Sequence, residues 1–232
     1  MNKQTFLTLL ATFALLFSFT FSCHAKGKDK AKHVVFIGLD GWGAYSLPKA
    51  DMPNVKKLME DGAYTLKKRS ALPSSSAINW ASMFMGAGPE LHGYTEWGSK
   101  TPELPSRVLN KNGIFPTVFQ LLRDARPEAE IGCLYEWEGI KYLVDTLSLS
   151  YHYHVADCNK TPKELGNMAS SYIKEKHPAL VAICYDGPDH TGHTAGHDTP
   201  EYYEKLKELD VYVGQIVQAV KDAGMLDDTI FI

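Results

Sequence analysis

Three compact apolar runs constrain the fold of this chain more than any other feature. The first covers residues 33–39 and is closed by Asp40-Gly41, and the others cover residues 179–185 and 228–232. Short apolar runs bounded by turn residues are typical of strands that are buried on both faces, as in a parallel sheet. We therefore predict that these three segments lie in the core of one sheet.

Segments with helical spacing alternate with these runs. We predict a further strand at residues 130–135, and we predict helices at residues 52–61, 76–85, 117–124, 161–176 and 200–223. This alternation indicates an α/β fold, a mainly parallel sheet with helices on both faces. Residues 86–160 fit the pattern least, and their Gly, Pro, Trp and Tyr content indicates a loop-rich cap. With 232 residues in total, residues 33–232 suffice for one large domain.

The N-terminus has the pattern of a signal peptide. Lys3 is the first Lys, Arg, Asp or Glu and Lys26 is the next, while residues 6–21 are largely apolar and Ala25 offers a small residue for cleavage. This predicts a signal peptide at residues 1–25, a charged linker at 26–32, and export to the periplasm or the medium. A second interpretation is cleavage before Cys23 with lipidation of that residue, which would anchor the protein to a membrane.

Three cysteines remain after such cleavage. Cys184 lies in the apolar run 179–185 and is expected to be a buried thiol. Cys133 and Cys158 could then form a disulfide in an oxidising compartment, or all three thiols could be free. The net charge of −3 offers no broad basic surface for nucleic acid, so any recognition of phosphate must be local.

Polar residues follow two of the predicted strands directly. Ligands of open α/β sheets bind beyond the carboxyl ends of the strands, so Asp40 is a candidate metal ligand, although an Asp-Gly pair also makes turns. The segment 186–197 contains two Asp and three His. These are natural zinc ligands, and the glycines would let a loop fold around an ion; the alternative is a solvated loop. Asp186 could either orient a ligand or cap this loop.

A serine run precedes the predicted helix 76–85. Ser74, Ser75 and Ser76 follow Pro73, and the helix continues with Asn79. A serine at this place is ordinarily an N-cap. Free amides at a helix N-terminus also favour phosphate oxygens, and a serine hydroxyl beside a metal ion can become a nucleophile. Both interpretations are open on this segment alone.

Taken in order, these motifs resemble the type I phosphodiesterase/nucleotide pyrophosphatase family of the alkaline phosphatase superfamily. The resemblance rests on Asp40, Pro73 to Ser76 with Asn79, Gly88 to Gly93, and Pro188 to His193. It implies an alkaline phosphatase-like fold and two divalent metal ions, with zinc the expected metal. Asp40 and Ser76 would hold one ion, and Asp189 and His193 the other. It selects Ser76 as the nucleophile and gives His92 and Gly93 a structural role.

The resemblance also implies two departures. The remaining metal ligands of the family would follow Ile232, so we expect the chain to be an N-terminal fragment that has little activity by itself. The family often places an Asn at the substrate phosphoryl group where this chain has Trp97, so Trp97 and Asn79 are the expected substrate-binding residues. Glu96, Gly98 and Ser99 are neighbours that could replace that Asn.

The resemblance predicts an exported hydrolase of phosphodiester or pyrophosphate bonds that acts on a small-molecule ester through a phosphoserine at Ser76. A phosphomonoesterase of the same superfamily, or a silent, truncated binding protein, is the alternative. Four further acidic and imidazole side chains are set aside because we expect them outside the strand ends: Glu136, Glu138, His152 and His154. Five aromatic residues could either line a stacking pocket or belong to the core: Trp80, Trp97, Trp137, Tyr151 and Tyr153.

Overall fold

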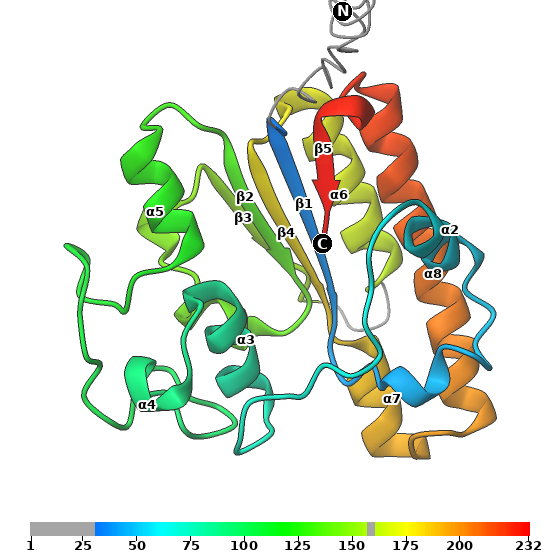
Figure 1. Cartoon of the computed structure of the whole chain (residues 1–232), viewed down its shortest axis with the longest axis horizontal. Coiled ribbons are helices and arrows are strands. Elements are labelled where there is room, and N and C mark those ends of the chain that lie inside the picture. Colours follow the sequence, from blue (N-terminus) through cyan, green and yellow to red (C-terminus); the bar gives the residue numbers. More distant parts are fainter. Residues whose placement is uncertain (1–30, 157–160) are drawn as a thin grey trace, which may run out of the picture. The chain divides into compact units, whose positions relative to one another are not determined.

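The computed structural model of the chain describes residues 31–156 and 161–232. In this part, five strands form one sheet in the order β3-β2-β4-β1-β5, and each neighbouring pair is parallel (Figure 1). The strands are β1 (His33–Leu39), β2 (Ile131–Tyr135), β3 (Tyr151–His154), β4 (Leu180–Tyr185) and β5 (Thr229–Phe231). The predicted parallel α/β sheet is therefore confirmed.

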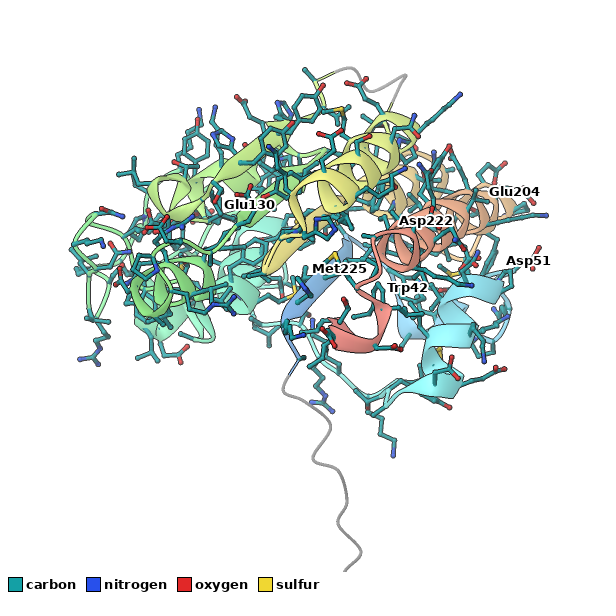
Figure 2. All side chains as sticks on the ribbon, turned by 90° about the horizontal axis from the view of Figure 1, so that it is seen from above. Trp42, Asp51, Glu130, Glu204, Asp222 and Met225 are labelled. Carbon is teal, nitrogen blue, oxygen red and sulfur yellow. The ribbon has the colours of Figure 1, made fainter. Side chains whose placement is uncertain are left out.

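Helices cover both faces of this sheet. Helices α3 and α5 lie on one face and α6 and α8 on the other, as Figure 1 shows; in Figure 2, Glu204 and Asp222 mark α8 from above. The α-helices are α2 (Pro53–Asp61), α3 (Ser76–Met85), α4 (Pro89–His92), α5 (Val118–Ala125), α6 (Lys163–Lys176), α7 (Gly187–Ala195) and α8 (Pro200–Asp222). Short 3-10 helices are η1 (Ala44–Ser46), η2 (Glu138–Tyr142), η3 (Thr146–Ser148) and η4 (Leu226–Asp228).

Of the three apolar runs, that of β4 is buried throughout, whereas β1 is mostly half-buried. The prediction of a core position is wrong for β5, which lies at the edge of the sheet with Ile230 49% exposed. Every residue of β2 and of β4 is buried, because helices cover both faces of these strands. Strand β3 was not predicted. It lies within the loop-rich segment 86–160 and pairs with β2, so this segment contributes two strands to the sheet.

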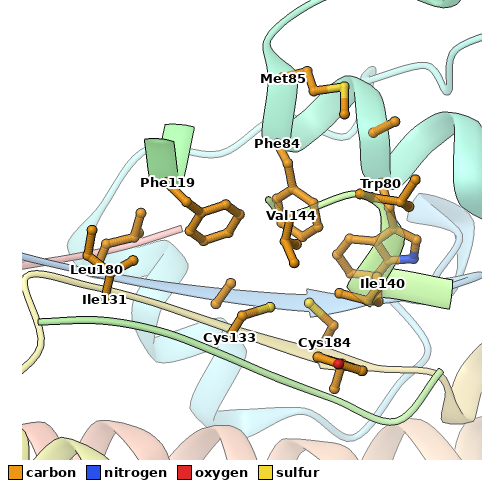
Figure 3. Packing of buried hydrophobic residues seen from close by; sticks show 14 of the residues in the cluster. Trp80, Phe84, Met85, Phe119, Ile131, Cys133, Ile140, Val144, Leu180 and Cys184 are labelled. Carbon is orange, nitrogen blue, oxygen red and sulfur yellow. The ribbon is translucent and has the colours of Figure 1, made fainter. Parts of the chain in front are cut away.

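An aromatic cluster fills the core between the sheet and α3 (Figure 3). The ring of Phe84 lies 5.9 Å from Phe36, 5.6 Å from Trp80 and 5.2 Å from Phe119, between ring centroids. Trp80 can approach β1 because Gly38 has no side chain: a Cβ there would lie 2.2 Å from the indole Cη2. The glycine thus lets the indole reach the carboxyl end of β1.

The cysteine pairing differs from the first expectation. Cys133 and Cys184 are free, buried thiols in the core of Figure 3, on neighbouring strands β2 and β4. The predicted disulfide of Cys133 is therefore wrong, and Cys184 is the buried strand thiol that the sequence indicated. Cys158, the predicted signal peptide and most of the charged linker lie outside the described residues.

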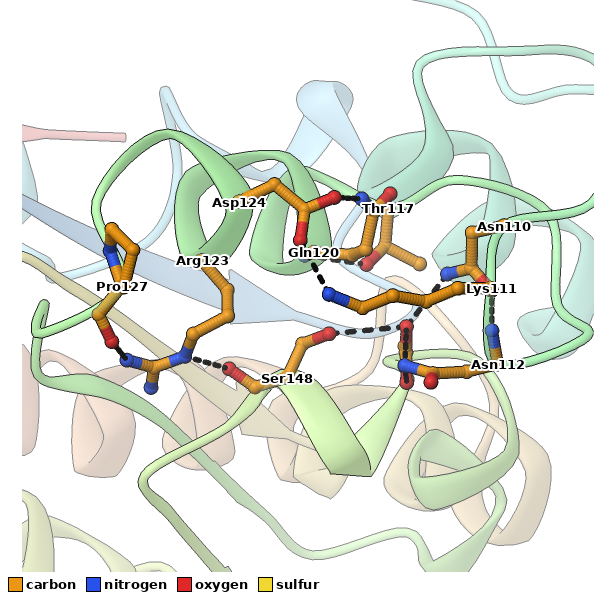
Figure 4. Close-up of polar contacts among 10 residues, drawn as sticks. Asn110, Lys111, Asn112, Thr117, Gln120, Arg123, Asp124, Pro127 and Ser148 are labelled. Atoms are coloured by element: carbon orange, nitrogen blue, oxygen red, sulfur yellow. Dashed lines mark hydrogen bonds and ion pairs between the residues drawn. The ribbon is translucent and has the colours of Figure 1, made fainter.

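The long connections around α5 are held by polar contacts, as Figure 4 shows. Asp145 is buried and has a left-handed backbone (φ 48°). Its carboxylate accepts hydrogen bonds from the amide of Asn110 (2.7 Å), the amide of Asn112 (3.1 Å) and the hydroxyl of Ser148 (3.1 Å). The buried carboxyl group is thus satisfied by neutral donors, which stabilises an otherwise irregular segment.

On the other face of the sheet, α8 holds the start of α2. Asp210 of α8 is 1% exposed, and its carboxylate accepts hydrogen bonds from the backbone amides of Asn54 (3.0 Å) and Val55 (2.8 Å). The side-chain amide of Asn54 donates to the same carboxylate at 2.9 Å. Within residues 31–156 and 161–232, we find no helix whose length and apolar character would let it span a membrane.

Candidate active site

Two strand ends meet at the carboxyl edge of the sheet. Strands β1 and β4 are neighbours, with Leu39 opposite Tyr185, and the amide of Asp40 donates to the carbonyl of Tyr185 at 2.9 Å. Asp40 and Asp186 therefore follow adjacent strands at the same edge. This is the position at which open α/β sheets bind their ligands.

The carboxylate of Asp40 is fixed on both oxygens. Its Oδ1 accepts a hydrogen bond from the amide of Gly41 (2.9 Å), and its Oδ2 accepts one from the indole Nε1 of Trp80 (2.9 Å). Gly41 takes the left-handed conformation (φ 66°) that the turn requires. A Cβ on Gly41 would lie 2.6 Å from the Cα of Asp189, so glycine also permits the close approach of α7.

Ser76 is the first residue of α3. Ser75 occupies the N-cap position with an extended backbone, but among the described residues its side chain makes no capping hydrogen bond. Amides at the start of the helix are therefore not occupied by the serine side chain that precedes it. The ordinary explanation of the serine run, an N-cap by Ser75, does not account for this helix start.

Asn79 ties the serine loop to α3. Its Oδ1 accepts from the amide of Ala71 (2.8 Å), and its Nδ2 donates to the carbonyls of Ser75 (3.0 Å) and Ala71 (3.4 Å). Both ends of the side-chain amide are therefore occupied by backbone. These contacts place Ser76, and the contact of Asn79 with substrate stays a prediction.

The histidine-rich segment 186–197 is mainly a helix, α7, and the expectation of a loop was wrong. Asp189 and His193 lie one turn apart, with His193 Nε2 at 3.3 Å from Asp189 Oδ2. The helical spacing of four residues places the two side chains on the same face. A helix, and not the glycine-containing loop expected from the sequence, therefore positions Asp189 and His193.

Two adjoining cavities lie over these residues. One has a volume of about 430 Å³ and includes Trp137, Asp186 and His190 in its lining. The other, of about 450 Å³, includes Asp40 and Asn79. Both cavities are lined by four of the predicted site residues: Ser76, Trp97, Asp189 and His193.

The carboxylates of this site repel one another. Burial, and next the charge of Asp40, raise the pKa of Asp189 above its ordinary value. Burial raises the pKa of Asp186 to about 6, with further contributions from Asp40 and Asp189. Negative charges gathered in one place are stabilised by a cation.

The donor set fits a divalent cation in its chemistry. Carboxylate oxygens and imidazole nitrogens are zinc ligands, and Asp40, Asp189 and His193 line one cavity together with Ser76. In the described part of the chain, however, no three His, Cys, Asp or Glu side chains come close enough together to hold a metal ion by themselves. The residues offer part of a coordination shell.

Trp97 is an exposed aromatic residue beside a second indole. Its side chain is 65% exposed, and its ring lies 6.3 Å from that of Trp137 at an angle of 37°. The neighbouring Ser99 is not free to replace it, because its hydroxyl is bonded to Glu96 O (2.9 Å) and Glu103 Oε2 (2.9 Å). An aromatic wall, rather than an amide donor, therefore lines this part of the cavities.

Sequence reasoning missed two residues of the site. Trp80 holds Asp40, and the signal that could have found it is its place one helical turn after Ser76, beside Asn79. Glu136 was set aside as lying outside the strand ends, but it directly follows β2. Its Oε2 accepts from the amide of Asp186 at 2.6 Å, which joins it to the start of α7.

This fold and site define a class: α/β proteins that hold a serine hydroxyl, carboxylates and an imidazole beyond the ends of parallel strands. The sequence profile of the type I phosphodiesterase/nucleotide pyrophosphatase family matches residues 34–232. The chain belongs to this family, within the alkaline phosphatase superfamily.

Curated relatives agree with this assignment. Over 201 residues the chain is 23% identical to mouse ectonucleotide pyrophosphatase/phosphodiesterase family member 1, covering 82% of this chain and 22% of that protein. It is 20% identical to venom phosphodiesterase 2 of Crotalus adamanteus over 233 residues, covering 83% and 25% respectively. The chain thus spans about a quarter of the length of these relatives.

A solved structure shows the same fold. An inactive form of murine ectonucleotide pyrophosphatase/phosphodiesterase 5, in complex with AMP, superposes with a TM-score of 0.65 at 16% identity. The match covers 86% of this chain and 55% of that one.

Proposed function

We propose that this protein hydrolyses phosphodiester or pyrophosphate bonds of small-molecule esters, with Ser76 as the nucleophile. The observation that carries the proposal is the place of Ser76 at the start of α3, where it lines both cavities together with Asp189 and His193. Family membership supports this class of reaction, since curated relatives are named as phosphodiesterases and pyrophosphatases.

The start of α3 suits a phosphoryl group. Amides at the first turn of a helix point toward the N-terminus and favour anionic oxygens. Asp40 and Ser76 would hold one divalent ion, and Asp189 and His193 a second, with zinc the metal that suits these ligands. When bound, such ions neutralise phosphoryl oxygens and lower the pKa of a coordinated hydroxyl group.

The reaction divides into two steps at Ser76. In the first, the serine Oγ gives its proton to solvent and attacks phosphorus in line, so that the bond to the leaving oxygen breaks as the Oγ–P bond forms and the leaving oxygen takes up a proton from solvent. The alcohol or phosphate leaves, and Ser76 carries the phosphoryl group, with its remaining substituent, as a phosphoserine ester. In the second step, water attacks the same phosphorus, the P–Oγ bond breaks and the serine takes back a proton.

Trp97 and Trp137 lie where they could contact the group attached to phosphorus. Both indoles line the cavity that also contains Ser76. Planar or apolar groups gain contact area against aromatic rings, about 0.5–1.5 kcal/mol beyond area burial for aromatic pairs. The AMP bound to the murine structural neighbour supports a small-molecule phosphate ester as the ligand class. We assign Trp97 to this contact because it lines both cavities.

Export belongs to the same proposal. The pattern of residues 1–25 is that of a signal peptide, with lipidation of Cys23 as the variant that would add a membrane anchor. N-terminal sequencing and mass measurement of the mature protein distinguish the two, since cleavage after Ala25 removes Cys23 and lipidation retains it.

Hydrolysis of two esters by the full-length protein tests the function. We expect bis-p-nitrophenyl phosphate to be cleaved faster than p-nitrophenyl phosphate, with zinc bound to the protein. Ser76→Ala should lower kcat by roughly 10³-fold or more, because the nucleophile is lost. Ser170→Ala is the matched control, since its buried hydroxyl has no partner among the described residues and lies on α6, on the face of the sheet opposite α3.

The outcomes separate the alternatives. A preference for the monoester selects a phosphomonoesterase. Turnover that survives in Ser76→Ala overturns the assignment of the nucleophile. A folded protein that binds no zinc and cleaves neither ester is a silent binding protein.

A further inference from the structure

Helix α7 begins without a cap of its own. Asp186 occupies the N-cap position with a helical backbone (φ −98°, ψ −15°), and its side chain makes no capping hydrogen bond within the described structure. Asp186 is instead among the residues that line the cavity with Ser76. Because the first amides of a helix need acceptors, another group must satisfy them.

Glu136 supplies that acceptor from the neighbouring strand. Its Oε2 accepts the amide of Asp186 at 2.6 Å, and the neighbouring amide of Gly187 also favours the ionised form of the carboxyl group. A carboxylate is favoured at this place because a helix N-terminus carries partial positive charge. The acidic cap that the helix lacks is thus provided by the residue after β2.

The backbone of Glu136 is held from both sides. Its amide donates to the carbonyl of Cys184 at 3.1 Å, and His154 Nε2 lies 3.0 Å from its carbonyl oxygen. The carboxylate is mostly buried: in the described part of the chain, neither its Oε1 nor the Tyr185 hydroxyl has a hydrogen-bond partner. A buried acid with one unsatisfied oxygen costs stability, so a functional reason for its presence is needed.

We propose that Glu136 is a positioning residue of the active site: by capping α7 it fixes Asp189 and His193, and it spares Asp186, a residue of the cavity lining, from capping the helix. The catalytic consequence rests on the function proposed above, whereas the capping itself does not. Groups that orient metal-binding side chains typically contribute 10- to 100-fold to metal affinity or activity.

The chain contains a matched control at the other end of β2. Glu130, which is labelled in Figure 2, directly precedes this strand. Its Oε1 accepts a hydrogen bond from Tyr172 at 2.8 Å. Glu130 is therefore a carboxylate of the same type, bonded at the edge of the sheet away from α7. Its replacement reports the general cost of losing a glutamate beside β2.

The test compares Glu136→Ala, Glu136→Gln and Glu130→Ala in the full-length protein, with three readouts. These are hydrogen exchange of the Asp186 and Gly187 amides, zinc affinity by competition with a chelator, and kcat/KM for bis-p-nitrophenyl phosphate. We expect Glu136→Ala to exchange these amides faster and to lose about 10- to 100-fold in zinc affinity and kcat/KM. Glu136→Gln keeps an acceptor oxygen and should restore most of each, and Glu130→Ala should resemble the wild type.

The exchange readout decides the inference independently of activity. If the wild-type protein cleaves neither ester, the proposed function fails while faster exchange in Glu136→Ala still supports the cap. Unchanged exchange in Glu136→Ala overturns the inference, as does an equal loss in Glu130→Ala. If Glu136→Ala does not fold, Glu136→Gln decides. The amide oxygen of Gln can still accept the hydrogen bond of a cap, so this variant should keep most of its zinc affinity. A loss of zinc affinity as large as that of Asp189→Ala would contradict the inference.

Discussion

His92 is buried with both ring nitrogens engaged, and this defines what it does. The amide of Tyr94 donates to Nδ1 at 3.1 Å, so Nδ1 carries no hydrogen and Nε2 carries one. Nε2 therefore donates to the hydroxyl of Ser82, 3.1 Å away. A histidine that donates to a serine cannot remove its proton, so this pair is structural, in agreement with the role that the sequence motif indicated.

The pH dependence of stability tests this state of His92. Burial lowers the pKa of His92 below its ordinary value of 6.5. Below about pH 6.5 the unfolded chain therefore binds a proton at His92 that the folded protein does not bind. The contribution of His92 to the free energy of unfolding is present above about pH 6.5 and is lost as the pH falls below it. We expect the free energy of unfolding in urea to fall more steeply between pH 7 and pH 5 in the wild type than in His92→Gln. Parallel pH curves would contradict the burial of a neutral imidazole.

At the residue scale, sequence reasoning found the side chains that follow a strand or begin a helix. Asp40 and Ser76 could be placed because strand ends and helix starts are visible in the apolar pattern. Glu136 and Trp80 could not, because their partners, Asp186 and Asp40, lie far away in the chain. Likewise, the hydrogen bonds of Asn79 depend on how residues 71–75 fold back on α3.

Helix α7 shows where tertiary contacts override local pattern. Its sequence contains glycine and histidine, which have low helix propensity, and it therefore resembled a loop. The fold compensates in three ways. Pro188 lies at the helix start, Glu136 caps the helix, and the imidazole of His197 packs against Gly192. A Cβ on Gly192 would lie 2.2 Å from the Cε1 of His197. None of these is visible as periodicity.

Strand β3 was missed for a related reason. It has four residues, Tyr and His in alternation, and lies at the edge of the sheet. Its assignment depends on pairing with β2, where Gly132 lies opposite Tyr151. A short edge strand without an apolar run gives little signal.

A buried carboxylate of α8 binds the start of α2. Asp210 accepts the first amides of α2 and the side chain of Asn54. We expect Asp210→Ala to lower the free energy of unfolding by about 2–4 kcal/mol, because it leaves buried donors unsatisfied. Urea denaturation measures the change.

Asp222 provides the control for this prediction on the same helix. Its carboxylate accepts a hydrogen bond from Gln218 at an exposed position. Asp222→Ala should change the free energy of unfolding by no more than about 0.5 kcal/mol, as is usual for exposed positions. Equal losses in the two variants would show that Asp210 does not hold α2.

At the scale of the whole molecule, the class of fold was predictable and the order of the strands was not. Buried apolar runs that alternate with amphipathic helices indicate a covered parallel sheet. The order β3-β2-β4-β1-β5 follows from long-range packing, such as that of Phe84 between Phe36 and Phe119, which no local pattern encodes. It is this order that places the ends of β1, β4 and β2 side by side and so assembles the site.

Trapping the covalent intermediate tests the central claim, that Ser76 attacks phosphorus, most directly. The full-length protein is mixed with bis-p-nitrophenyl phosphate, quenched in acid during turnover and digested for mass spectrometry. We expect a nitrophenylphosphoryl group on Ser76, formed as one nitrophenolate leaves, and none in Ser76→Ala. An adduct on another residue, or rapid turnover of Ser76→Ala, would contradict the account.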